Sequence, residues 1–406
     1  MSNVSLSTSG EAAATGEVPG RDVLGAVPAL ALGTFAVGTD AFVVAGFLPE
    51  LAADLGVSTA TAGQAVTVFA AAYALLSPVL ATLTARLPRR RLLVGALLGL
   101  GAANLASALA PTFGVLLVSR VAAAAAAAAF TPNAGAVAAF LVRPERRARA
   151  LAVVVGGLTV ATALGVPLGG LAGQWTGWRW ALGAVAGLAL LVAGAVSVLL
   201  PHLSGNPRVP LRERLAVLRR PAVRAILPLT VLGMAAAYTV YAYSVPALAA
   251  VGLTAGDTAW ALGLYGVGAV LGNLAAGLVT DRLGGVRVLA VGYVVMAAGL
   301  AGLGALAASG ARVPVLVGVL MVAWGAGSWC QTPPQQHRLI AAAPGEAPLV
   351  VALNSSAIYT GIGAGTLVGG LTARPGATMM YATAAGLAVA ALVYLLVTAG
   401  ERTASS

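Results

Sequence analysis

Hydrophobic runs of about twenty residues follow one another along most of the chain. A helix of ~20 residues crosses the ~30 Å hydrocarbon core of a bilayer, so each run is long enough to span a membrane. Apolar and polar residues do not alternate with a period of two, which favours helices over a barrel of strands. Twelve spans are predicted, with the approximate bounds 23–48, 60–84, 91–110, 113–140, 149–172, 178–200, 224–250, 258–280, 287–308, 312–333, 348–371 and 376–398.

The composition agrees with a membrane protein and excludes a soluble one. Hydrophobic residues make up 59% of the chain and charged residues only 9%, and the mean hydropathy is +0.94. The 52 glycines suit helices that approach one another closely in lipid. Cys330 is the single cysteine, which excludes an intrachain disulfide and a cysteine metal cluster.

The net charge of +11 is explained by topology and does not indicate nucleic-acid binding. All 23 basic residues are arginines, and they lie mainly in short loops. With the amino terminus in the cytoplasm, nineteen arginines fall on the cytoplasmic side, against Arg179, Arg312 and Arg374 on the other. This bias follows the positive-inside rule. We therefore expect a multi-pass membrane protein with both termini in the cytoplasm. The use of Arg alone and the abundance of Ala and Gly suggest a high-GC bacterial genome, and so a bacterial cytoplasmic membrane.

The chain divides into two halves that resemble each other. A shift of 196 positions lays TARLPRRRLL (84–93) on TDRLGGVRVL (280–289), and it also superposes Gly165, Gly169 and Gly173 on Gly361, Gly365 and Gly369. Internal repeats indicate a transporter whose site lies between the repeats. The predicted parts are a disordered cytoplasmic tail at 1–22, a six-helix bundle at 23–200, a cytoplasmic linker at 201–223, a six-helix bundle at 224–398 and a cytoplasmic tail at 399–406.

Several stretches have recognisable motifs. They are GTDAFVVAGFLPELAADLGVSTATAGQAVT (38–67), ATLTARLPRR (81–90), LLVSRVAAAAAAAAF (116–130), GGLTVATALGVPLGG (156–170), GQWTGWRW (173–180) and GLVTDRLGG (277–285). In these motifs the chain resembles a major facilitator superfamily transporter of the drug:proton antiporter branch, similar to arabinose and chloramphenicol efflux proteins. The resemblance covers residues 22–398. It implies an all-α membrane protein of twelve transmembrane helices in two pseudo-symmetric six-helix bundles, the major facilitator fold.

Two charged side chains lie well inside hydrophobic spans, Asp40 and Arg120. A charge at membrane depth costs ~2.5–3.5 kcal/mol on insertion scales, so such residues usually have a function. Asp40 is placed toward the outer face, as a carboxylate that alternates between protonated and bound forms; the alternative is an Asp solvated from outside at a helix break. Arg120 is placed in the middle or cytoplasmic third of its span. The resemblance links it to proton coupling, and the alternative is a structural Arg that binds carbonyls. No pairing of the two is predicted, because their depths differ.

Polar residues within other spans are candidates to line a substrate cavity. The alternative for each is a hydrogen bond between helices or an aromatic at the membrane interface. The polar residues of this kind are Gln64, Asn104, Asn133, Tyr238, Tyr241, Tyr243, Asn273, Trp324, Trp329, Gln331, Asn354 and Tyr359. The cavity candidates selected from them are Asn133, Tyr238, Tyr241, Trp324, Gln331 and Asn354.

The motif residues have expected roles in gating and packing. Asp281 and Arg282 are expected to tie helix ends together, whereas Ala85 leaves the first copy of this loop motif without its carboxylate. Gly165, Pro167 and Gly169, in the stretch similar to the antiporter motif, are expected to bend their helix and let it pack closely.

The sequence contains neither a phosphate-binding G-x-x-x-x-G-K-[ST] loop nor an HExxH or GxSxG motif, so no cofactor and no enzymatic activity are expected. The predicted function is proton-coupled efflux of a small, partly hydrophobic compound such as a drug or metabolite. The predicted partners are this substrate, protons and the lipid bilayer, with the chain as a monomer. One alternative is an exporter or proton symporter of a sugar, nucleoside or amino acid. Others are a transport-inactive membrane sensor and a membrane-embedded enzyme.

Overall fold

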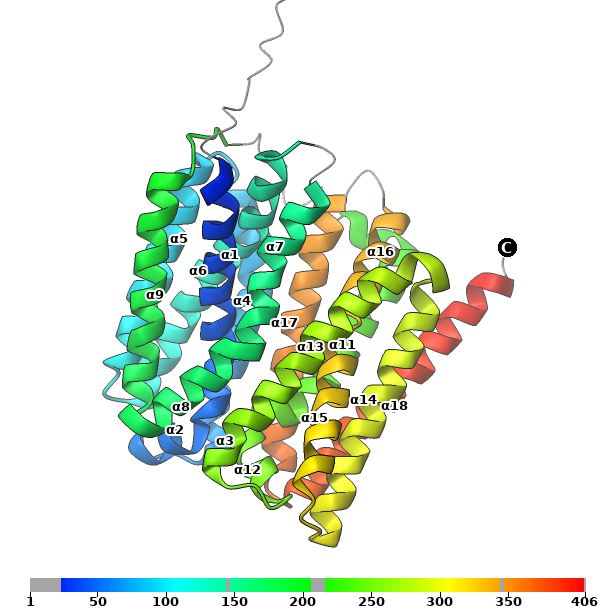
Figure 1. Cartoon of the computed structure of the whole chain (residues 1–406). Helices are drawn as coiled ribbons and strands as arrows, with labels where there is room; N and C mark the ends of the chain where they lie inside the picture. Colours follow the sequence, from blue (N-terminus) through cyan, green and yellow to red (C-terminus); the bar gives the residue numbers. More distant parts are fainter. Residues whose placement is uncertain (1–22, 144–146, 206–215, 344–346, 405–406) are drawn as a thin grey trace, which may run out of the picture.

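The computed structural model describes residues 23–143, 147–205, 216–343 and 347–404, and their regular elements are all helices (Figure 1). The first half contains α1 (Val23–Phe42), η1 (Val43–Gly46), α2 (Leu48–Asp54), α3 (Thr59–Ala62), α4 (Gln64–Leu83), α5 (Arg89–Ala108), α6 (Phe113–Phe140), α7 (Arg147–Val160), η3 (Ala161–Gly165), α8 (Val166–Thr176) and α9 (Trp178–Leu199). The second half contains η4 (Val217–Arg219), α11 (Pro221–Tyr241), α12 (Ser244–Ala249), α13 (Ala255–Leu283), α14 (Gly285–Ser309), α15 (Pro314–Trp329), α16 (Thr332–Ala342), α17 (Ala347–Thr372) and α18 (Ala377–Ala404).

Ten helices in the described ranges are long and apolar enough to cross a membrane, and a bent pair, Val153–Gly165 with Pro167–Gly173, makes an eleventh span. The remaining expected span, 348–371, corresponds to α17, which is not among these ten. Its first half contains the sequence Asn354–Ser355–Ser356, and the helix packs between α4 and α11. A helix surrounded by protein can carry such polar residues, because its neighbours satisfy them. The arrangement is an all-α membrane fold.

The two halves meet along two seams. Within the first half, α5 packs between α6 and α9, and α1 contacts α6, α7 and α9; within the second half, α11 packs between α17 and α18, and α14 packs between α15 and α18. Between the halves, α4 packs on α17, and α13 packs on η3 and α8. In Figure 1, α5, α6 and α9 lie at one side of the molecule and α14 and α18 at the other.

The two ends of the bundle differ. We call the end where α1 begins and α18 ends the terminal face, and the opposite end, which carries α2, α3 and α12, the short-helix face (Figure 1). At the short-helix face the halves touch, since α12 contacts α2 and η1, and α3 contacts α17. A side chain at Gly370 would come within 2.7 Å of the Tyr243 hydroxyl. The Tyr243 hydroxyl donates to the Thr366 carbonyl at 3.2 Å.

Several of the expected spans are interrupted. The span predicted at 149–172 contains a π-helical turn, η3, and its two segments meet at 41°. Pro167 follows this turn and has no N–H for a helical bond, which explains the bend. The span predicted at 224–250 ends as α11 at Tyr241, before the separate helix α12. The span predicted at 312–333 breaks after Trp329 and continues as α16 to Ala342.

An exposed ion pair ties three connections together at the short-helix face. The Arg179 guanidinium pairs with the Asp54 carboxylate, lies 4.3 Å over the Trp178 ring and donates to the Ala110 carbonyl at 3.0 Å. The hydrogen bond from Arg179 lowers the pKa of Asp54 below its ordinary value. Exposed pairs of this kind stabilise little individually, by ~0–1 kcal/mol. The cluster therefore serves mainly to orient α2 against α9.

Candidate functional site

A buried ion pair joins α1 to α6. The Arg120 Nη1 donates to the Asp40 Oδ1 at 2.5 Å, and both side chains are fully buried. The Arg120 Nη2 also donates to the Asp40 backbone carbonyl at 3.0 Å. On its other side the guanidinium lies 4.6 Å over the Phe69 ring of α4. The planar fork of Arg120 therefore connects three helices of the first half.

The pairing corrects the expected depth of Arg120. The chain runs from the terminal face to the short-helix face along α1 and in the opposite direction along α6. The end of α1 and the start of α6 therefore lie at the same face. Asp40 is the third residue from the end of α1, and Arg120 is the eighth residue of α6. Both therefore lie in the part of the bundle near the short-helix face. Arg120 thus lies before the middle of α6 and at the same depth as Asp40, so the expected difference in depth, which was the reason for assigning no partner, was wrong. Which side of the membrane this end faces stays a prediction.

The glycine-rich face of the bent helix holds α1 in place. A side chain at Gly157 would collide with the Ala31 carbonyl, one at Gly165 with Thr39, and one at Gly169 with Val43. The Thr34 hydroxyl donates to the Val154 carbonyl at 2.5 Å. Because glycine allows this close approach, α1 is fixed directly before and after Asp40.

The Asp40–Arg120 pair is not fully satisfied. The second carboxylate oxygen of Asp40 and the Nε of Arg120 are buried and have no hydrogen-bond partner among the described residues. A buried pair repays its desolvation only when its remaining polar atoms are bonded. The pair is thus easier to perturb than a closed network. In the described part of the chain, no cluster of three His, Cys, Asp or Glu residues could hold a metal ion.

An aromatic cluster connects this region to the second half. Phe42, two residues after Asp40, lies 5.6 Å from Tyr238 and 6.2 Å from Trp329, measured between ring centroids. Tyr241 lies 5.0 Å from Tyr238 and 6.2 Å from Trp324. The cluster draws on α1, α11 and α15, so it crosses from one half to the other.

A second group of rings crosses at the α4–α17 seam. Tyr73 stacks on Tyr359 with a centroid distance of 3.7 Å, and Phe69 lies 6.2 Å from the same ring. The Phe69 ring also lies under the Arg120 guanidinium at 4.6 Å, which links these rings to the charge pair. The charge pair and both ring groups therefore form one continuous site between the halves, which we call the central site.

Several hydrogen-bond donors in the central site lack partners, among them three that belong to predicted residues. The hydroxyls of Tyr238 and Tyr241 and the indole N–H of Trp324 are buried, without an acceptor in the described residues. An unsatisfied buried polar group costs ~1–3 kcal/mol. A bound molecule with acceptor groups, or water, would recover this energy. The site is thus aromatic, carries one paired carboxylate, and offers donors to a ligand.

The structure brings five of the predicted residues together and places three elsewhere. Asp40, Arg120, Tyr238, Tyr241 and Trp324 belong to the central site. The other three cavity candidates bind protein groups: Asn133 accepts from Arg89 at 2.8 Å, Gln331 accepts from Tyr293 at 3.2 Å, and Asn354 accepts from Thr230 at 3.0 Å. Each follows the alternative of a hydrogen bond between helices.

The loop-motif residues lie at the end of α13. Arg282 is exposed there, and the side chain of Asp281 lies outside the described residues. Their gating role stays a prediction. Gly165, Pro167 and Gly169 belong to the bent helix, and the Cγ of Pro167 is 3.9 Å from where a Cβ at Gly263 of α13 would lie. The stretch similar to the antiporter motif therefore takes part in the α13 seam as well as supporting α1.

Sequence reasoning missed four aromatic residues of the central site: Phe42, Phe69, Tyr73 and Tyr265. Tyr265 lies 4.8 Å from both Tyr241 and Trp324. Aromatics often gather at the membrane interface, and Phe has no polar atom to mark it. For Phe69, Tyr73 and Tyr265, a position well inside a span was the available signal, whereas Phe42 is the last residue of α1.

The comparisons with known proteins agree with this architecture. The family model described as Major Facilitator Superfamily matches residues 30–248 and 229–406. A chloramphenicol resistance protein of Streptomyces lividans is 36% identical over 353 residues, covering 84% of this chain and 88% of the relative. The inner membrane transport protein YdhP of Escherichia coli (strain K12) is 31% identical over 376 residues, covering 91% and 94%.

The crystal structure of a D-xylose-proton symporter is similar in fold, with a TM-score of 0.78 at 14% identity, over 92% of this chain and 97% of that one. A likeness at this identity concerns the fold. The family match extends over nearly all of the residues from 30 onward. The chain therefore belongs to the major facilitator superfamily of membrane transporters.

Proposed function

We propose that the chain is a proton-coupled antiporter that exports a small, partly hydrophobic compound across a bacterial cytoplasmic membrane, working as a monomer by alternating access. The observation that carries the proposal is the buried Asp40–Arg120 pair at the edge of an aromatic site between the halves. The pair supplies a group that can take up a proton, and the rings supply apolar surface for a substrate. The 36% identity to a chloramphenicol resistance protein supports export of a drug-like compound.

The proposed coupling uses the two bonds of Arg120 to Asp40. When the Asp40 carboxylate is ionised, it accepts from Arg120 at 2.5 Å. When it is protonated, the charge attraction is lost, but Arg120 still donates to the backbone carbonyl of Asp40. The guanidinium then becomes an uncompensated positive charge beside Phe69. Proton uptake thus changes the state of the pair, and the proposed exchange requires that substrate favours the other, ionised state.

The contacts between the halves support an inward-facing assignment for this structure. At the short-helix face, α12 contacts η1 and α2, and the α13 seam is tight enough that a side chain at Gly266 would collide with Ala163. Near the terminal face, α16 packs on α11, α13, α14 and α17, which all belong to its own half. If the terminal face is cytoplasmic, the outer side is the closed one.

The cytoplasmic location of both termini and of the linker 201–223 is a prediction that labelling can test. The arginine bias requires the linker to stay inside. A cysteine introduced at Asn206, which lies outside the described residues, in a Cys330→Ala background should not react with an impermeant maleimide in intact cells. It should react after permeabilisation. Labelling in intact cells would reverse the orientation proposed here.

The unpartnered donors of the central site predict which substitutions weaken substrate binding. Tyr241→Phe removes one hydroxyl and Trp324→Phe removes the indole N–H, while both keep a ring. One hydrogen bond is worth ~0.5–1.5 kcal/mol, so KM should rise by about two- to tenfold for each, with kcat little changed. The measurement is pH-gradient-driven uptake into inverted vesicles of a compound first found to stabilise the purified protein, with chloramphenicol included in that screen.

The control for these variants is Tyr394→Phe. The Tyr394 hydroxyl donates to the Ala225 carbonyl at 3.2 Å, away from the central site. Its removal should leave KM unchanged. If Tyr241→Phe and Trp324→Phe behave like this control, the substrate does not contact these donors.

A further inference from the structure

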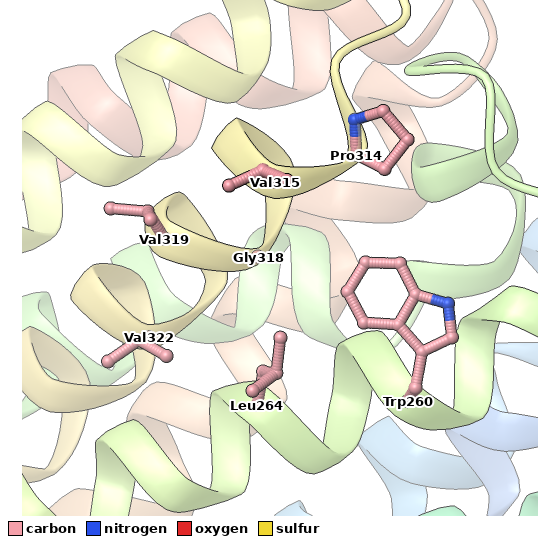
Figure 2. Close-up of a pocket in the computed structure, with 7 residues that line it drawn as sticks. All are labelled: Trp260, Leu264, Pro314, Val315, Gly318, Val319 and Val322. Carbon is pink, nitrogen blue, oxygen red and sulfur yellow. The ribbon is translucent and has the colours of Figure 1, made fainter.

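A groove on the outer surface of the second half separates α13 from α15 (Figure 2). It has a volume of about 540 Å³ and is lined by Trp260 and Leu264 on one side and by Pro314, Val315, Gly318, Val319 and Val322 on the other. Val315 is 80% exposed and Val319 is 59% exposed, so the groove opens away from the central site. In a membrane protein this surface faces lipid.

The groove exists because the two helices diverge toward the short-helix face. Farther from this face α13 and α15 touch through their backbones, since a side chain at Gly268 or Gly325 would collide with the other helix. Nearer to the face, Gly318 keeps the floor of the groove open, because a Cβ there would lie 3.0 Å from Leu264 and narrow it. From Pro314 to Val322 the groove runs about 12 Å along the helix. This matches the ~15 Å depth of one leaflet.

Two opposite charges flank the mouth of the groove. Arg312 lies two residues before Pro314 and is exposed. The aliphatic part of its side chain packs closely on Gly252, since a Cβ added to this glycine would lie 2.6 Å from the Arg312 Cγ. Asp257 accepts from the backbone N–H and hydroxyl of Thr254, at 2.9 and 2.7 Å, and from the Trp260 indole at 3.2 Å. Neither residue belongs to the two ion pairs found in the described residues.

We propose that this groove binds a phosphatidylethanolamine molecule, with one acyl chain along α15, its phosphate on Arg312 and its ammonium group toward Asp257. A guanidinium suits a phosphate because its fork donates to two oxygens. An anionic headgroup would meet the Asp257 carboxylate without a cation to offer it. A choline headgroup carries a cation but no N–H to donate. The apolar lining and the two charges thus select a zwitterionic lipid with a primary amine. This site is independent of the transport mechanism proposed above.

Quenching of Trp260 fluorescence by brominated lipids tests this site. The purified full chain in lipid-free detergent micelles is titrated with acyl-brominated phosphatidylethanolamine, phosphatidylglycerol or phosphatidylcholine. The chain has six tryptophans, so the same titration of Trp260→Phe is subtracted to isolate the Trp260 signal. We expect phosphatidylethanolamine to reach half-quenching at a concentration at least fivefold below that of the other two lipids.

Matched variants separate this site from general lipid contact. Arg312→Gln should raise the half-quenching concentration several-fold, whereas Arg374→Gln, another exposed arginine of the same face, should not. Val319→Phe fills the groove and should weaken quenching, whereas Val291→Phe on α14, itself 64% exposed, should not. If all three lipids quench equally and Arg312→Gln does not change this, the groove makes only ordinary annular contact with lipid and the proposal is wrong. Tighter binding of phosphatidylglycerol would also overturn the proposal.

Discussion

Replacing Asp40 by Asn is expected to abolish transport driven by a pH gradient while leaving the protein folded. Asn keeps the size of the side chain and an oxygen that can accept from Arg120, but it cannot bind or release a proton. Exchange of substrate down its own gradient should persist, because the aromatic cluster is unchanged. The measurement is uptake in proteoliposomes with and without an imposed pH gradient, together with the melting temperature of the purified variant.

Asp54→Asn is the matched control. It makes the same chemical change in the exposed pair with Arg179, so driven transport should remain near wild type. Uphill transport by Asp40→Asn at the wild-type rate would remove Asp40 from the coupling mechanism. Loss of driven transport and of downhill exchange together, in a folded protein, would instead make Asp40 a substrate contact.

Much of the fold could be predicted from the sequence, because lipid imposes a simple rule on helix length. The apolar runs and the 196-residue repeat predicted two bundles of spans, and the helices follow them closely. The breaks were harder to predict. Pro167 marks the bend of the fifth span, but the π-turn before it depends on packing against α1 and α13. The less apolar α17 was still recognisable through its glycine repeat.

The candidate site was only half predictable. Charge inside an apolar span marked Asp40 and Arg120 individually, since burial makes such residues rare. Their pairing depends on opposite helix directions and on which face of α6 meets α1, and this was misjudged. Asn133, Gln331 and Asn354 could not be distinguished from Tyr238 or Trp324, because every one is a polar residue in a span. Only the three-dimensional contacts show that the first three bind other helices.

Removing the positive charge of Arg120 should destabilise the protein more than any surface substitution. Arg120→Gln leaves the Asp40 carboxylate buried without a cation, and breaking a buried pair in this way costs ~3–5 kcal/mol. Asp40→Asn in the same chain removes the uncompensated charge. The double variant should therefore have a higher melting temperature than Arg120→Gln alone, although it carries one more substitution. Thermal unfolding of the four proteins in one detergent gives this comparison.

Arg120→Lys separates charge from geometry. Lys keeps the positive charge, but its single ammonium cannot reproduce the planar fork that donates at once to the Asp40 carboxylate and the Asp40 carbonyl, at 2.5 and 3.0 Å. Stability should fall less than in Arg120→Gln, while driven export should still drop. Arg179→Gln, in the exposed pair, is the control and should cost at most ~1 kcal/mol. If Arg120→Lys exports at the wild-type rate, a positive charge near Asp40 is sufficient and the fork has no role in coupling. If Arg120→Gln proves as stable as Arg179→Gln, Asp40 does not carry a charge in the folded protein.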